Sequence, residues 1–204
     1  MWKWKGQCMI DPAKVTNYNR THVQLEEFIL FAINVAGKKS SVEAPKLDRF
    51  LIALKDLYGN LCEHSDSPFS LIRYAWAEGT LMQLMKKYSI SPYKQRYNSY
   101  IDVMMISDLY LVSLNRLLQV RGIGLKTARF FLSHSREDFD EPMLDTHILH
   151  FLRDQGYSNA PKTTPTNPSV YHQFASIFKD IARQLGKSVT DLDLEVWKKY
   201  SGTA

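Results

Sequence analysis

The fold is decided by the stretch Val120-Arg121-Gly122-Ile123-Gly124-Leu125-Lys126-Thr127-Ala128. Its two glycines lie between one apolar helical pattern that ends at residues 117–118 and another that begins at residue 128. This arrangement predicts two short helices joined by a tight turn, a helical hairpin. Glycine adopts positive φ at little cost and lets its backbone N–H groups approach an anion. Because the second helix adds positive partial charge at its N-terminus, the hairpin predicts a DNA phosphate as ligand.

The hairpin and the residues after it resemble the signature of the HhH-GPD superfamily of DNA glycosylases. In that family a lysine stands two residues after the second hairpin glycine and an aspartate follows in an Asp-x-His context, as Lys126 and Asp145 do here. Residues 25–33 look like the family's first core helix, and residues 191–197 look like the last helix of its archaeal-type oxoguanine branch. The resemblance implies an all-α, two-lobed helix-hairpin-helix DNA glycosylase fold in a single domain. Its lobes would comprise about residues 22–155 and residues 1–21 plus 156–204.

Lys126 and Asp145 are the candidate catalytic residues. On spacing alone, Lys126 is more often a solvated residue or a phosphate contact, and Asp145 is most often an N-cap of the helix that follows. In a desolvated cleft, however, a neutral Lys126 amine can attack C1′ of a nucleotide, expel the base and form a Schiff base. A capped Asp145 stays ionised, so it can also stabilise the oxocarbenium-like transition state and take a proton from the amine.

Further site residues follow from the hairpin and from the resemblance. The candidates for DNA contact are Arg121, Gly122, Gly124, Thr127 and His147, and Arg129 is either a phosphate contact or a solvated residue. Because the target base is buried in the DNA stack, the enzyme is expected to flip it into a pocket between the lobes. By resemblance that pocket is lined by Phe28, Phe31, Gly37, Lys38, Asp193 and Trp197, and core or surface packing explains each of them at least as well.

Two departures from the family pattern bear on the substrate. The archaeal-type oxoguanine glycosylases end in a lysine that reaches the base, whereas this sequence ends Ser201-Gly202-Thr203-Ala204. Residues 34–38, Asn-Val-Ala-Gly-Lys, are similar to a divergent, partly phage-associated branch that deals with hypermodified pyrimidines. Oxidised guanine, in DNA repair, and a hypermodified pyrimidine such as glucosylated hydroxymethylcytosine, in antiviral defence, are therefore competing substrates.

Two hypotheses of other classes stay open beside base excision. One is a transferase of the same fold that modifies thymine in phage DNA without cutting the glycosidic bond, and it predicts a changed base and no abasic site. The other is a non-catalytic hairpin module, which predicts that Lys126 and Asp145 can be replaced with no loss beyond DNA binding.

Apolar residues recur at helical spacing almost throughout the chain, and no segment alternates convincingly as a strand does. Helices are predicted at residues 23–36, 43–58, 68–76, 79–88, 92–105, 108–119, 125–133, 146–155, 168–185 and 190–199. Pro161, Pro165 and Pro168 mark the one clear loop, and Asn167-Pro168 predicts a cap and first turn for the helix that follows.

Composition limits the structural and functional classes to which the chain can belong. The 204 residues are 45% hydrophobic, which is enough to bury one sizeable core, and the net charge of +5 permits a nucleic-acid partner without requiring one. Cys8 and Cys62 are too few for a zinc or iron–sulfur site, so reduced thiols are expected. Neither a signal peptide nor a membrane-spanning run is recognisable. We expect a cytoplasmic, nucleoid-associated monomer that binds double-stranded DNA containing a modified base. We expect no membrane association, no catalytic metal and no cofactor, apart from a monovalent cation that the hairpin allows.

Overall fold

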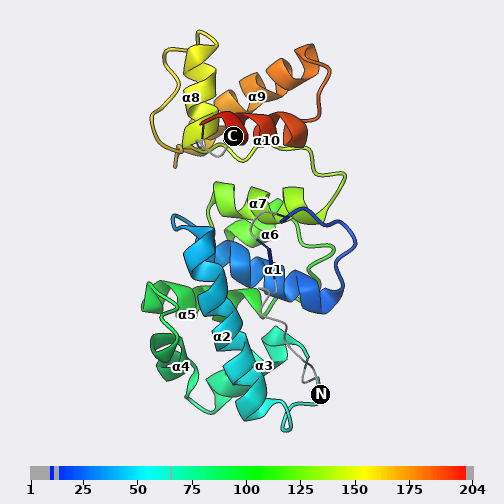
Figure 1. Ribbon diagram of the computed structural model, residues 1–204, viewed down its shortest axis with the longest axis vertical. Coiled ribbons are helices and arrows are strands. Elements are labelled where there is room, and N and C mark those ends of the chain that lie inside the picture. The colour runs from blue at the N-terminus through cyan, green and yellow to red at the C-terminus, as the bar shows by residue number, and fades with distance from the viewer. Residues whose placement is uncertain (1–9, 12–13, 65, 201–204) are drawn as a thin grey trace. The chain divides into compact units, whose positions relative to one another are not determined.

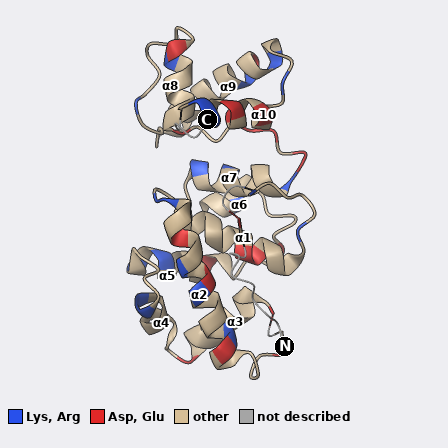
Figure 2. Ribbon diagram, viewed as in Figure 1, with Lys and Arg blue, Asp and Glu red and all other residues tan. Residues whose placement is uncertain are grey.

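The computed structural model describes residues 10–11, 14–64 and 66–200 (Figure 1). Within these ranges the chain forms ten α-helices and no β-strand, so the predicted all-α class is confirmed. The contacts divide the chain into two compact units, of which unit 1 ends at Ile123 and unit 2 begins at Gly124. Each unit is described by itself. Acidic and basic residues are interspersed along the helices of both units (Figure 2).

The helices lie close to their predicted places. Unit 1 contains α1 (His22–Val35), α2 (Ser40–Tyr58), α3 (Pro68–Ala77), α4 (Leu81–Lys87), α5 (Tyr93–Val103) and α6 (Leu114–Leu118). Unit 2 contains α7 (Leu125–Ser135), α8 (Thr146–Asp154), α9 (Pro168–Gln184) and α10 (Val189–Tyr200). The predicted cap at Asn167 is confirmed, because its side chain accepts a hydrogen bond from the Ser169 amide at 2.9 Å and Pro168 opens the helix.

The largest difference from prediction is at α6, which is much shorter than the predicted helix at 108–119. The Asp108 carboxylate accepts a hydrogen bond from the Tyr110 amide at 2.7 Å, which holds a local turn where the helix was expected to start. Ser113 then caps α6 by accepting from the Arg116 amide at 3.1 Å. Aspartate and serine side chains compete in this way with helical backbone hydrogen bonds, and apolar spacing does not reveal it.

Helix α1 runs through the core of unit 1, where it packs against α2, α3 and α5. All residues from Phe28 to Asn34 are buried, so the helix is covered on every side rather than along one stripe. Thr21 and Gln24 form a reciprocal capping box at its start. The helix is therefore a fixed support for the elements around it.

Unit 2 is built on a second core in which α8, α9 and α10 pack against one another. One side of each helix supplies it, and its members include Ile148, Leu152, Phe178 and Leu192. Leu125, the first residue of α7, packs against the same cluster. The hairpin's second helix thus begins on the core that carries α8 and α10.

The two units differ from the predicted lobes of residues 22–155 and 1–21 plus 156–204. Helix α8 belongs with α9 and α10 because its apolar face is buried against them. The described residues before α1 belong with unit 1, where the Arg20 guanidinium lies 3.8 Å from the centroid of the Phe28 ring and the Tyr110 hydroxyl donates to the Arg20 carbonyl. The division therefore falls inside the hairpin.

Several expectations concern residues at the ends of the chain or its surface. Cys62 is a free cysteine, whereas Cys8 and the final residues 201–204 lie outside the described residues. In the described part of the chain, no helix combines the length and the apolar character that a bilayer crossing needs.

Candidate active site

The first half of the hairpin requires glycine at position 122. Gly122 has φ of 83°, and a Cβ added there would lie 2.8 Å from Ser99 Oγ. Gly124, by contrast, has φ of −99° and open space where a Cβ would stand, and it serves as the N-cap of α7. The expected positive φ is therefore found at only one of the two glycines. At Gly124 the absent side chain leaves the N-terminus of α7 uncovered.

Arg121 is held by helix α5. Its Nε and Nη2 atoms donate to the two oxygens of Asp102 at 2.7 and 2.6 Å, and its backbone N–H donates to Asp102 Oδ2 at 3.0 Å. This ion pair lowers the pKa of the Asp102 carboxyl below its ordinary value. Ser99 Oγ donates to the Arg121 carbonyl at 2.6 Å. The guanidinium that the sequence offered for DNA contact thus already has a bidentate partner.

We expect that Arg121→Gln leaves the salt dependence of DNA binding nearly unchanged. A side chain that binds a phosphate contributes about 0.9 to the slope of log K against log salt concentration, and a guanidinium neutralised by Asp102 contributes little. Titrations at several salt concentrations measure this slope. Asp102→Asn is the matched control, because it frees Arg121 and should steepen the slope. If Arg121→Gln lowered the slope by about 0.9, the ion pair would open on DNA.

Lys126 and Asp145 come together at the starts of two helices in unit 2. Lys126 is the second residue of α7, and Asp145 is the N-cap of α8. Asp145 Oδ1 accepts from the His147 and Ile148 amides at 2.8 and 3.0 Å, whereas Oδ2 lies 3.5 Å from Lys126 Nζ. The capping role expected of Asp145 is confirmed, and it leaves one oxygen facing the amine. The Lys126 side chain is 50% exposed, so the amine is open to a substrate, and the desolvated surroundings expected for it are not found in the structure.

Asp193 of α10 is the third ionisable residue of this group. Its Oδ2 is buried and has no hydrogen-bond partner. Burial, followed by the negative charge of Asp145, raises the pKa of Asp193 to about 7, while a hydrogen bond from the Met143 amide and the charge of Lys126 act in the opposite direction. Two carboxyl groups in unlike environments therefore stand beside one amine, an arrangement typical of acid–base chemistry.

We expect Asp193→Asn to stabilise the protein at pH 8 and to have no such effect near pH 4. The folded pKa of about 7 lies above the ordinary value of 3.8, so the folded state binds this proton more tightly than the unfolded chain does. The contribution of Asp193 to the free energy of unfolding therefore declines as pH rises from 3.8 to about 7 and is constant above that range. A shift of this size corresponds to an upper bound of roughly 4 kcal/mol.

Denaturant unfolding at a series of pH values measures this effect. Glu27→Gln in α1 is the control, because burial and the charge of Asp48 also raise the pKa of Glu27 to about 7. The same pH-dependent gain is expected there, without any change at the Lys126–Asp145 pair. An Asp193→Asn variant with the same stability as the wild type at pH 8 would contradict the raised pKa.

The other predicted residues of unit 2 lie near this group. Thr127 follows Lys126 and is partly buried, and His147 donates its backbone N–H to Asp145. Trp197 is 44% exposed and stands one helical turn after Asp193, so the two side chains share a face of α10. Unit 2 thus places Asp193 and Trp197, both predicted for the substrate pocket, on the same face of α10, with the Asp193 carboxylate buried and the Trp197 ring partly exposed.

The predicted pocket residues of unit 1 have other roles in the structure. Phe28 and Phe31 are completely buried in the core and stack with ring centroids 6.2 Å apart. Gly37 takes φ of 72° just after α1 ends. Lys38 Nζ donates to Ser91 and pairs with Glu43 Oε2 at 3.3 Å. The core and surface alternatives stated for these residues therefore agree with their surroundings.

Near the site, Arg129 has surroundings other than those predicted, and Tyr171 was not predicted at all. Arg129 is only 2% exposed, with its guanidinium carbon 4.4 Å from the centroid of the Tyr171 ring, so it is not the surface residue that was expected. Tyr171 is completely buried, and its hydroxyl bonds to the segment that precedes Asp145. Tyr171 lies on the apolar stripe of α9, and that spacing by itself indicates an ordinary core residue.

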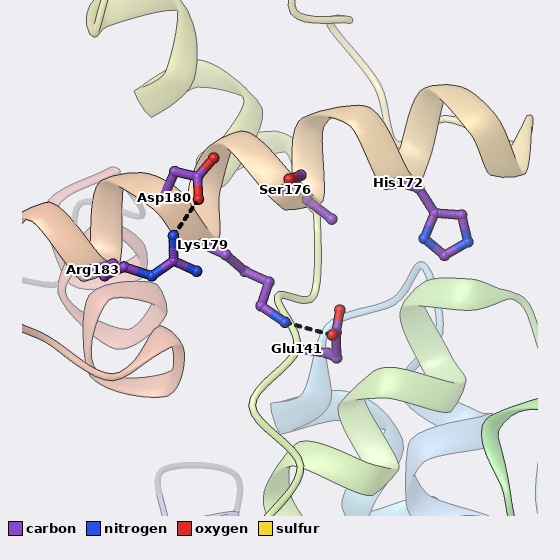
Figure 3. Close-up of a pocket in the computed structure, with 7 residues that line it drawn as sticks. Glu141, His172, Ser176, Lys179, Asp180 and Arg183 are labelled. Carbon is purple, nitrogen blue, oxygen red and sulfur yellow. Dashed lines mark hydrogen bonds and ion pairs between the residues drawn. The ribbon is translucent and has the colours of Figure 1, made fainter.

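Elsewhere in unit 2, a polar hollow of about 340 Å³ lies along α9 (Figure 3). Its lining includes Glu141, His172, Lys179 and Arg183, but not Lys126, Asp145 or Asp193. Across the described ranges, no three His, Cys, Asp or Glu side chains gather in a way that would hold a metal ion.

Known proteins resemble this chain over part of its sequence. No family model matches it. It is 39% identical over 88 residues to the 8-oxoguanine DNA glycosylase/AP lyase of Saccharolobus solfataricus, a match that covers 43% of this chain and 42% of that protein. The protein of the same name from Thermoplasma volcanium is 30% identical over 137 residues, or 62% of this chain and 65% of its own length. The chain therefore matches less than two thirds of the length of either relative.

The likeness in three dimensions extends further along the chain. Two structures of the Methanocaldococcus jannaschii 8-oxoguanine DNA glycosylase align with 93% of this chain. The first has a TM-score of 0.60 at 20% identity and 84% of its own length covered. The second, in complex with a 15mer DNA containing 8-oxoguanine, has a TM-score of 0.63 at 19% identity and 88% covered. The predicted helix-hairpin-helix glycosylase fold is confirmed.

Proposed function

We propose that this chain, which has the fold of the archaeal 8-oxoguanine DNA glycosylases, excises oxidised guanine from double-stranded DNA and can then cleave the strand. The observation that carries the proposal is the pair of Lys126 Nζ and Asp145 Oδ2, 3.5 Å apart at the starts of α7 and α8. A nucleophile beside a fixed carboxylate is the arrangement that covalent base excision requires. The names of the archaeal relatives support the same activity.

In the proposed reaction, the Lys126 ammonium first releases a proton to solvent, and the resulting neutral amine attacks C1′ of the flipped nucleotide. The glycosidic C–N bond breaks and its electron pair leaves with the base, while the ammonium formed at Nζ gives a proton to Asp145 Oδ2. Before that transfer, the ionised carboxylate stabilises the positive charge that develops on the sugar. The proton on Asp145 passes to O4′ as the C1′–O4′ bond breaks, which opens the sugar ring and leaves a Schiff base at Lys126. Loss of a proton from C2′ to water then expels the 3′ phosphate from that intermediate and cuts the strand.

In this proposal, Asp193 and Trp197 interact with the base that leaves. With a pKa of about 7, Asp193 is protonated in part of the molecules at neutral pH and can therefore supply a proton to the base as it leaves. The exposed Trp197 ring, one turn further along α10, offers a flat apolar surface of the kind on which a flipped base stacks. A monomer that needs no metal or other cofactor is sufficient for this chemistry, and the hairpin allows a monovalent cation.

Trapping with borohydride tests the proposal, because borohydride reduces a Schiff base to a stable covalent adduct. Matched duplexes would contain 8-oxoguanine, guanine, uracil, hydroxymethylcytosine, glucosylated hydroxymethylcytosine or an abasic site. We expect an adduct with the 8-oxoguanine and abasic duplexes and none with the guanine duplex.

Other outcomes of the same panel select the competing hypotheses. An adduct only with a modified pyrimidine duplex would support the glycosylase reaction and show that the substrate is the modified pyrimidine and not oxidised guanine. Abasic sites without an adduct would mean that Asp145 activates water. A changed thymine without an abasic site would identify a transferase, and binding of every duplex without any reaction would leave a DNA-binding module.

A further inference from the structure

We propose that Tyr171 is a positioning residue for Asp145, because its hydroxyl fixes the backbone that delivers this carboxylate to Lys126. The proposal rests on the proposed function, in which Asp145 acts on the amine. It concerns the segment 140–145, which connects α7 to α8 and ends at the N-cap aspartate.

The Tyr171 hydroxyl is bonded to this segment on both sides. It accepts a hydrogen bond from the Leu144 amide at 2.9 Å and donates one to the Pro142 carbonyl at 3.2 Å. Leu144 and Tyr171 are both completely buried, so water cannot replace these bonds. A single side-chain atom of α9 thus satisfies two backbone groups within three residues of Asp145.

Other elements of unit 2 also bond to this segment, through its backbone and through its side chains. Asp193 accepts from the Met143 amide, and Thr164 Oγ1 donates to the Leu144 carbonyl at 3.1 Å. Further back, Asp140 Oδ1 accepts from the Val189 amide at 2.9 Å, and Lys179 reaches from α9 to Glu141 Oε1 at 2.6 Å (Figure 3). The segment therefore takes its path from side chains and not from regular secondary structure.

Tyr171 is itself kept in place by Arg129. The guanidinium carbon lies 4.4 Å from the ring centroid, and Arg129 Nη2 lies 3.5 Å from both Glu141 Oε2 and His172 Nδ1. A cation over the face of an aromatic ring is attractive, the more so where both are buried. Arg129 stands three residues after Lys126 in α7, so the helix that carries the amine also supports the tyrosine that fixes the carboxylate.

This arrangement matters because Asp145 has two tasks with its two oxygens. Oδ1 caps α8, and Oδ2 faces the amine at 3.5 Å. If residues 142–144 shift, the backbone of Asp145 shifts with them, which weakens the bond from the His147 amide to Oδ1 and moves Oδ2 relative to Lys126 Nζ. A displacement of about 1 Å between reacting groups lowers a rate by about 100-fold.

Tyr171→Phe is the test, since it removes only the hydroxyl. We expect the single-turnover rate of Schiff-base formation on abasic DNA to fall by about 10- to 100-fold. The Kd for DNA with a tetrahydrofuran abasic analogue should stay unchanged, at a temperature where circular dichroism shows both proteins fully folded. Tyr200→Phe is the matched control, because it removes the bond from a tyrosine hydroxyl to Asp154 in the same unit and should not change the rate. Should Tyr171→Phe fail to fold, Thr164→Val weakens the same segment at the Leu144 carbonyl and is expected to lower the rate by a smaller factor.

Amide hydrogen exchange supplies a readout that does not depend on activity. Exchange at Leu144 and at His147, which donates to Asp145 Oδ1, should accelerate by at least about 10-fold in Tyr171→Phe, whereas exchange within α9 should not. Unchanged exchange at these two amides, or an unchanged rate in the folded variant, would overturn the proposal. If the wild type forms no adduct with any DNA, the proposed function fails, and the two amides still decide whether Tyr171 holds the segment.

Discussion

Asp145→Asn is expected to lower the rate of base release by about 100- to 1,000-fold while helix α8 stays intact. Asparagine is as good an N-cap as aspartate, so its side-chain oxygen can still accept from the His147 and Ile148 amides. The variant lacks the negative charge that stabilises the oxocarbenium-like transition state, and it cannot take a proton from Lys126. Single-turnover kinetics on the 8-oxoguanine duplex measure the loss, and thermal unfolding checks the cap.

Asp145→Ala separates the two tasks of this residue. It removes the charge and the cap together, so it should match the kinetic loss of Asp145→Asn and lose about 1 kcal/mol of stability in addition. An Asp145→Asn variant with wild-type kinetics would mean that Asp145 is a cap and nothing more.

Lys126→Gln is expected to abolish the borohydride-trapped adduct altogether. The amide of glutamine is not a nucleophile, so no Schiff base can form, whichever base the DNA contains. Gel analysis after reduction measures the adduct, and binding to a tetrahydrofuran-containing duplex should persist, because the substitution leaves the hairpin turn and the N-terminus of α7 unchanged.

Lys126→Arg is the matched control for charge. Arginine keeps a positive group beside Asp145 and can bind a phosphate, but its guanidinium is not deprotonated in proteins and cannot attack C1′. A catalytic Lys126 predicts that both variants lose the adduct. A lysine that only contacts a phosphate predicts that Lys126→Arg behaves as the wild type does.

The sequence located the helices because helix formation depends on local information, and the resemblance to a family motif singled out Lys126 and Asp145. Apolar spacing and short-range signals such as Asn167-Pro168 act within one or two turns, and the structure confirms them. Where a local hydrogen bond overrides spacing, as Asp108 does before α6, the predicted helix is too long. The turn at Gly122 was also predicted from local sequence. The Ser99 contact that makes glycine obligatory there is visible only in the structure.

Which charged side chains of the site are paired or buried could be recognised only from tertiary contacts. Arg121 looks like a phosphate contact until Asp102 is found beside it, and Arg129 looks solvated until it is found buried over Tyr171. Charge pairing and burial bring together residues far apart in the chain, and neither leaves a periodic trace in the sequence.

By itself, the sequence determined an all-α chain with a glycine hairpin and with Lys126 and Asp145 at the starts of successive helices. The tertiary structure alone decided that Asp193 stands beside that pair with a pKa of about 7, and that Tyr171 satisfies the backbone before Asp145. The physical reason is that helix formation and capping are settled between near neighbours in the chain. Desolvation and buried hydrogen bonds, in contrast, exist only once α9 and α10 have packed against the segment that carries Asp145.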